Sequence, residues 1–151
     1  MVAVLTIRLN VMDQESIVYG CIKDAIHFNE NAERRSVNRA AMLSLPRADE
    51  WPHLCQEMFA IPRVEQSSER YQTEVMHFGA SYKAIEYEWA QWMEKFESLL
   101  NRMYWVSAVV HLETELTGVH TFTWESRSDC HVPGAGIQQV SCEWMQENTF
   151  L

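Results

Sequence analysis

The sequence predicts an α+β fold: an antiparallel β-sheet made of an N-terminal strand and a C-terminal three-stranded meander, with a long aromatic-faced helix and two shorter helices packed on one face. Three observations lead to this prediction. Residues 2–11 alternate between apolar and polar side chains, residues 69–103 carry apolar side chains at helical spacing, and three alternating runs follow up to residue 145. A chain of 151 residues has the usual size of one domain, so residues 1–151 are expected to form a single α+β domain.

The first predicted element is a strand over residues 2–11. Thr6, Arg8 and Asn10 share one side of this stretch. The other side is apolar and consists of Ala3, Leu5, Ile7, Leu9 and Val11. A period of two residues is typical of a strand with one buried face.

A helix is predicted next, from a cap at Asp13 to about Phe28. Its apolar residues recur at intervals of three and four: Ile17, Val18, Cys21, Ile22, Ala25 and Ile26. The stretch that follows, residues 35–45, stays open between strand and helix because its apolar residues fit both periods.

A second short helix is predicted after Pro46. Asp49 suits its N-cap, Pro52 is tolerated in a first helical turn, and Pro62 marks the exit. Its apolar residues also recur at helical spacing: Trp51, Leu54, Cys55, Met58 and Phe59.

The strongest helical signal is a seam of apolar residues that step by four and three: Tyr71, Val75, Phe78, Tyr82, Ile85, Trp89, Trp92, Phe96, Leu99 and Met103. One straight helix over this seam would be roughly 50 Å long, whereas a compact domain of this size has a radius of gyration of about 15 Å. We therefore expect a break or bend near Gly79 and a main helix over residues 82–103. Its bulky rings suit packing on a sheet better than a two-stranded coiled coil.

The sheet is completed by three alternating runs over residues 104–115, 119–125 and 137–145, with a turn at Thr117 and Gly118. The inner face is predicted to hold Val106, Ala108, Val110, Leu112, Phe122, Trp124, Val140, Cys142 and Trp144. The outer face is predicted to hold Trp105, Val109, His111, Glu113, Glu115, Thr121, Thr123, Glu125, Gln139, Ser141 and Glu143.

The charge distribution argues against nucleic-acid binding. The net charge is −9, and residues 84–151 carry three basic against ten acidic side chains. Phosphate binding requires clustered Lys and Arg. Arginines do gather between Arg34 and Arg70, but acids lie between them, so surface ion pairing is the expected role of this stretch.

The N-terminal sequence predicts neither export nor membrane insertion. It lacks a basic n-region, and Arg8 interrupts its apolar run. The four cysteines are scattered without a CxxC pair, which favours reduced thiols over a disulfide framework. A cytoplasmic location is expected.

No catalytic, metal or cofactor site is predicted from the residue spacing. Asp129, Cys130 and His131 place a carboxylate, a thiol and an imidazole in a row, but neighbouring residues of an extended loop point in opposite directions, so a polar loop tip is expected. His111, His120 and His131 lack the paired spacing that fixes metal ligands together, and no metal is expected.

The first functional hypothesis is a non-enzymatic, acidic interaction protein, similar in role to an inhibitor or immunity protein. Its surface would be the outer sheet face, formed by Trp105, Val109, His111, Glu113, Glu115, Glu125 and Glu143. The expected partner is a basic protein. Trp105 and Val109 are apolar on this polar face, which also predicts a homodimer.

The second hypothesis is a small-molecule-binding domain or enzyme with an aromatic pocket between the long helix and the sheet. The pocket would be lined by Tyr82, Trp89, Trp92, His120, Phe122, Trp124 and Trp144. Ligand pockets are mostly apolar with a few polar groups at the mouth, so a small apolar ligand is expected.

Overall fold

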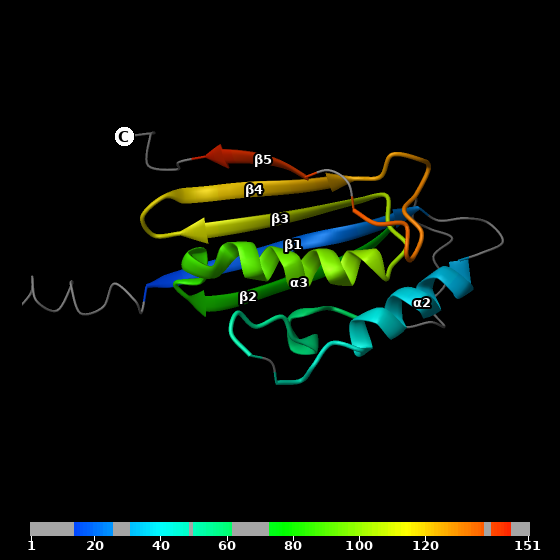
Figure 1. Cartoon of the computed structure of the whole chain (residues 1–151), viewed down its shortest axis with the longest axis horizontal. Helices are drawn as coiled ribbons and strands as arrows, with labels where there is room; N and C mark the ends of the chain where they lie inside the picture. Colours follow the sequence, from blue (N-terminus) through cyan, green and yellow to red (C-terminus); the bar gives the residue numbers. More distant parts are fainter. Residues whose placement is uncertain (1–13, 26–30, 49, 62–72, 138–139, 146–151) are drawn as a thin grey trace, which may run out of the picture.

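The computed structural model describes residues 14–25, 31–48, 50–61, 73–137 and 140–145. The predicted strand over residues 2–11 lies outside these ranges. Within them the chain forms one antiparallel sheet and two α-helices, which confirms the α+β class (Figure 1).

The sheet has five strands in the order β2-β1-β3-β4-β5, and each neighbouring pair is antiparallel. The strands are β1 (Glu15–Ala25), β2 (Thr73–Lys83), β3 (Ser107–Thr114), β4 (Gly118–Glu125) and β5 (Val140–Met145). The predicted meander is confirmed as β3-β4-β5, and Gly118 has the positive φ of 78° that the predicted turn requires.

The predicted helix between Asp13 and Phe28 is wrong, because this stretch forms the central strand β1. Val18 and Ile22 face the helices and are fully buried, while Ile17 and Cys21 occupy the opposite face and are half-buried. A strand that is apolar on both faces places apolar residues in adjacent pairs, and such pairs imitate the three-and-four spacing of a helix.

Gly20 lets β1 and β3 approach each other. A Cβ atom at this position would lie 1.9 Å from the carbonyl oxygen of Val109 and 3.0 Å from Cζ of Phe78. No other residue fits this position without moving the backbone, so Gly20 is a packing requirement of the central strand.

The seam over residues 71–103 contains three elements rather than a single helix. Val75, Phe78 and Tyr82 belong to β2, η3 (Ile85–Glu88) is a short 3₁₀ turn, and only α3 (Trp89–Asn101) is α-helical. The chain breaks at Ala84, which has a φ of 49°, and not at Gly79, which lies inside β2. Phe78 and Tyr82 are four residues apart and therefore share a face in a strand as well as in a helix.

The segment left open by the sequence is helical and forms α2 (Asn31–Leu43). The second predicted short helix is wrong, since residues 50–61 contain only the 3₁₀ turn η2 (Gln56–Met58). The side chain of Gln56 donates hydrogen bonds to the carbonyls of Leu43 and Leu45, and Phe59 forms a β-bridge with Phe78. These contacts hold the segment in a mostly extended form along the edge of β2.

The polar face of α2 is anchored by buried ion pairs, not by the exposed pairs that the sequence predicted. Arg34 donates two hydrogen bonds to Asp24 of β1 and one to Cys130 Sγ. Arg35 pairs with Glu74 of β2 at 3.0 Å. Burial lowers the pKa of Arg34, but the bonds to Asp24 and Cys130 outweigh this effect and raise it above its usual value.

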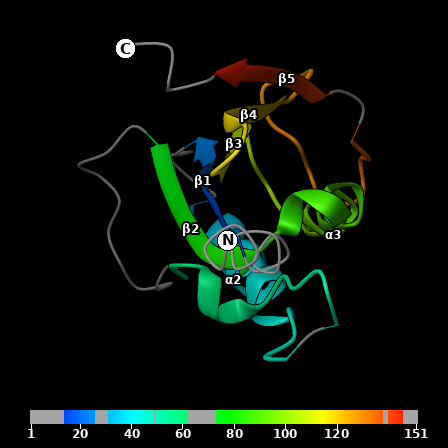
Figure 2. The ribbon, with the colours of Figure 1, turned by 90° about the vertical axis from the view of Figure 1, so that its left-hand side faces the viewer.

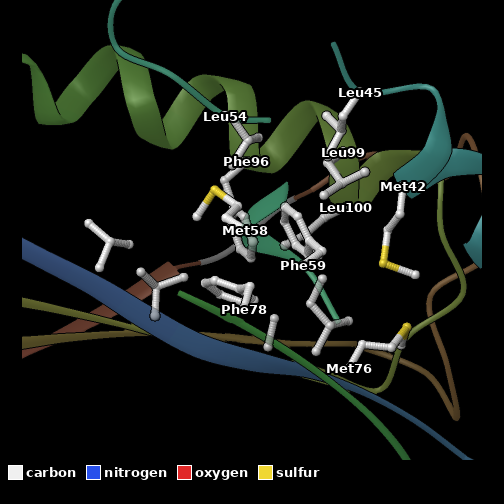
Figure 3. Close-up of a cluster of buried hydrophobic side chains, with 14 of the residues drawn as sticks. Met42, Leu45, Leu54, Met58, Phe59, Met76, Phe78, Phe96, Leu99 and Leu100 are labelled. Carbon is white, nitrogen blue, oxygen red and sulfur yellow. The ribbon is translucent and has the colours of Figure 1, made fainter. Parts of the chain in front are cut away.

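Helix α3 covers the concave face of the sheet, and α2 lies near one end of the same face (Figures 1 and 2). The side chains between these layers form a single core, part of which is shown in Figure 3. Trp92, Phe96 and Trp124 are fully buried at its centre. On β5 the predicted inner-face residues Cys142 and Trp144 are exposed, a correction to the predicted core.

Candidate ligand site

Two polar atoms at the start of α3 are fully shielded and have no hydrogen-bond partner among the described residues: Oε1 of Glu86 and Nε1 of Trp89. The left-handed conformation at Ala84 ends β2 and starts the 3₁₀ turn that carries Glu86. Residues three apart in a helical stretch lie on the same side, so the carboxylate and the indole belong to one site. This side of the chain thus carries a buried acceptor and a buried donor, and neither has a partner among the described residues.

An imidazole from the sheet completes the polar part of this site. His120 lies on the inner face of β4, and its Nε2 is 2.9 Å from the hydroxyl oxygen of Thr117. Burial lowers the pKa of His120 below its usual value of 6.5, and the carboxylate of Glu86 opposes this shift by favouring the charged imidazole. Glu86 and His120 are therefore electrostatically coupled although they come from different elements.

Aromatic rings lie next to Trp89 and His120. The ring of Trp89 is stacked on Trp92 at 4.8 Å and lies 5.3 Å from the ring of Phe122. Trp144 lies 6.0 Å from the ring of His120 and donates a 2.5 Å hydrogen bond from Nε1 to the carbonyl of Thr117. We call Glu86, Trp89, His120, Phe122 and Trp144 the α3–β4 site.

Four of the residues predicted to line an aromatic pocket belong to this site: Trp89, His120, Phe122 and Trp144. Trp92 and Trp124 are 0% exposed and belong to the core behind it. Tyr82 has a different role, since its hydroxyl accepts a 3.1 Å hydrogen bond from Trp92 Nε1 and donates to the carbonyl of His53. Glu86 was not predicted, because its burial depends on the chain reversal at Ala84.

The chain matches no family model, no curated protein and no solved structure. The function must therefore be inferred from the chain itself. None of the described helices is long and apolar enough to cross a membrane. In the same part of the chain no group of three or more His, Cys, Asp and Glu side chains is arranged to hold a metal ion.

The predicted interaction surface is less concentrated than expected. Glu113 pairs with Val119 and Glu125 pairs with Ser107, so these two acids lie at opposite ends of the β3–β4 ladder. Glu143 lies opposite Thr121 in the middle of β4, and Glu115 is exposed in the turn. The acidic side chains are spread over the face and do not form a carboxylate cluster.

The aromatic part of the predicted surface also needs correction. Trp105 precedes β3 and is only 2% exposed, because its ring stacks on His131 and its Nε1 donates to the carbonyl of Leu100 at 2.8 Å. Val109 is half-buried, and His111 contacts the hydroxyl of Thr121 and the ring of Tyr19. The exposed apolar strip of Trp105 and Val109 that suggested a homodimer is therefore not present.

Proposed function

We propose that the protein binds a small organic amine that also carries an oxygen acceptor, and that the α3–β4 site holds it. One observation carries the proposal: Glu86 Oε1 and Trp89 Nε1, three residues apart in the chain, are both buried and have no hydrogen-bond partner among the described residues. An unsatisfied buried polar atom costs about 1–3 kcal/mol, and two such atoms at one place are best explained by a ligand that satisfies both.

The ligand class follows from the groups that would contact it. A carboxylate oxygen accepts from an N–H donor and bonds most strongly to a charged amine. The indole N–H requires an acceptor, such as a hydroxyl or carbonyl oxygen. Aromatic faces such as those of Trp89, Phe122 and Trp144 attract cations, and the net charge of −9 attracts them over longer distances.

Binding can be measured by tryptophan fluorescence and thermal shift with a panel of amino alcohols, amino amides and their uncharged isosteres. Glu86→Gln keeps the shape of the side chain but removes its charge, so we expect affinity for amines to fall about 10- to 100-fold. Trp89→Phe keeps the ring but removes the N–H, so it should weaken only those ligands that carry the oxygen acceptor.

Glu94→Gln is the matched control, because Glu94 is exposed on α3, eight residues after Glu86, and its substitution should leave binding unchanged. Equal losses in Glu86→Gln and Glu94→Gln would assign the effect to overall charge and contradict the proposed site. If no amine in the panel changed the fluorescence or the melting temperature, the proposed ligand class would be rejected.

We keep an interaction protein as the second candidate, favoured by the outer sheet face, on which no described helix packs (Figure 2). Tyr19 and Val75 are 37% and 39% exposed there. A basic protein would bind this face in a salt-dependent manner, and reversing Glu113 and Glu143 to Lys should abolish that binding. The hypothesis would be contradicted if basic proteins bound equally well at low and high salt and the double substitution did not change this binding. A homodimer stays a proposal that sedimentation can test.

A further inference from the structure

A cavity of about 210 Å³ lies between the start of β3 and the loop that joins β4 to β5. Its walls include Trp105, Ser126, Cys130, His131, Val132 and Ile137. None of these residues belongs to the α3–β4 site. The cavity and the α3–β4 site are therefore separate regions of the molecule.

The loop around this cavity is held in place by backbone hydrogen bonds. His131 N donates to the carbonyl of Trp105 at 2.7 Å, and Trp105 N donates back to the carbonyl of His131 at 3.3 Å. Gly134 N and Gly136 N both donate to Asn101 at the end of α3, at 2.7 and 2.8 Å. A wall fixed to both α3 and β3 is organised before any ligand arrives.

His131 presents an unused acceptor in this region. The side chain is 6% exposed, and its Nδ1 lies 2.8 Å from the carbonyl oxygen of Met103. A carbonyl can only accept, so Nδ1 carries the proton and Nε2 of the neutral ring holds a lone pair. Nε2 is shielded and has no partner among the described residues.

Cys130 and His131 are neighbours in the chain but do not form a pair of nucleophile and base. Cys130 Sγ accepts a 3.3 Å hydrogen bond from Arg34, whereas the imidazole bonds to Met103, so the thiol and the ring have separate partners. Asp129 is exposed, as expected for a loop tip, but His131 is buried. Nε2 of His131 is therefore not engaged by the neighbouring thiol, and His131 is one of the residues that line the cavity.

The charged residues of the lining, Glu125 and Arg127, are exposed, and the hydroxyls of its two serines already have acceptors. The hydroxyl of Ser126 donates to the carbonyl of Ser128 at 2.6 Å, and the hydroxyl of Ser128 donates to the carbonyl of Cys130 at 3.0 Å. Their hydrogens are thus already used, while Trp105, Val132 and Ile137 supply apolar surface. The molecule that would fit this cavity is therefore apolar and carries one hydrogen-bond donor.

We propose that this cavity binds a small, uncharged, apolar molecule with a single hydroxyl, which donates to Nε2 of His131. The cavity is smaller than the 300–1,000 Å³ that is typical of drug-sized ligands, which limits the molecule to a compact one. Phenol is a suitable probe, and toluene is its matched analogue without the donor.

Phenol and toluene are titrated into the full chain while the ¹⁵N resonance of the His131 ring is followed by NMR. Phenol should shift the Nε2 resonance and bind about tenfold more tightly than toluene. His131→Phe keeps a ring against Trp105 but removes the acceptor, so it should abolish the preference for phenol.

Ala135→Leu tests the cavity without changing His131, because Ala135 lines it and the larger side chain fills it. Both probes should then lose binding, while Ala90→Leu, at an exposed site on α3, should leave binding unchanged. Equal affinity for phenol and toluene in the wild type, or binding that survives Ala135→Leu, would overturn the proposal. An Nε2 resonance that neither probe moves would show that the cavity holds only water.

Discussion

At the scale of single residues, the buried polar side chains of the described part of the chain fall into two classes. Those that hold the fold are fully paired, as in the reciprocal bonds between Asn38 and the backbone of Tyr104 at 2.9 and 2.7 Å. Those without partners among the described residues are Glu86 Oε1, Trp89 Nε1 and His131 Nε2. Natural proteins satisfy most buried polar groups, so the exceptions mark the places where a ligand is expected.

His120 gives a prediction about pH. Its pKa in the folded protein lies below 6.5, first because of burial, although Glu86 opposes the shift. As the pH falls through about 6.5, the unfolded chain takes up a proton that the folded chain does not, so the free energy of unfolding decreases. The stability that His120 contributes is present above its unfolded pKa and is lost as the pH falls toward its folded pKa.

Urea unfolding at about pH 7.5 and about pH 5.5 measures this loss. His120→Gln should reduce it, since the amide can still contact Thr117 but does not titrate in this range. Glu86→Gln should enlarge it, because removal of the carboxylate lowers the pKa of His120 further. If the wild type, His120→Gln and Glu86→Gln all lost the same stability between the two pH values, His120 would not be the cause of the loss.

At the scale of elements, α2 is attached to the sheet by charges as well as by apolar contacts. Arg34→Ala would leave Asp24 buried without its cation, and breaking a buried pair in this way costs about 3–5 kcal/mol of the free energy of unfolding. Arg47→Ala, at an exposed position in the following loop, should change it by less than about 0.5 kcal/mol.

Thermal and urea unfolding of both variants check this prediction. Combining Asp24→Asn with Arg34→Gln should recover part of the loss, because no charge then remains buried. If Arg34→Ala lowered the free energy of unfolding no more than Arg47→Ala does, the ion pair would not anchor the helix.

The elements also show which parts of the sequence are informative. The meander was predicted correctly because its first strand, β3, has one buried and one half-buried face, so apolar and polar residues alternate along it. β1 was mistaken for a helix because both of its faces are apolar. The apolar residues over 71–103 were mistaken for one helix because Phe78 and Tyr82, which lie in β2, are four residues apart, a spacing that also fits a helix. The strand ends at Ala84, where the backbone has a positive φ, and the helical residues follow.

At the scale of the whole molecule, the sites were harder to predict than the layers. The aromatic residues of the α3–β4 site could be found from their spacing on α3 and β4, because a helix on a sheet brings these faces together. Glu86 and His131 could not, since each becomes buried only through a turn or loop between elements. Sequence patterns identify faces, whereas sites at the junctions of elements depend on the three-dimensional path of the chain.

The central position of β1 has a consequence for the newly made chain. β1 is synthesised before both of its neighbours, β2 and β3, which begin at Thr73 and Ser107. At a synthesis rate of about 5–20 residues per second, β1 waits for seconds on the ribosome with two unpaired edges. Residues 15–25 therefore lack both strand partners until Thr73–Lys83 has been made, and lack the second partner until Ser107–Thr114 follows.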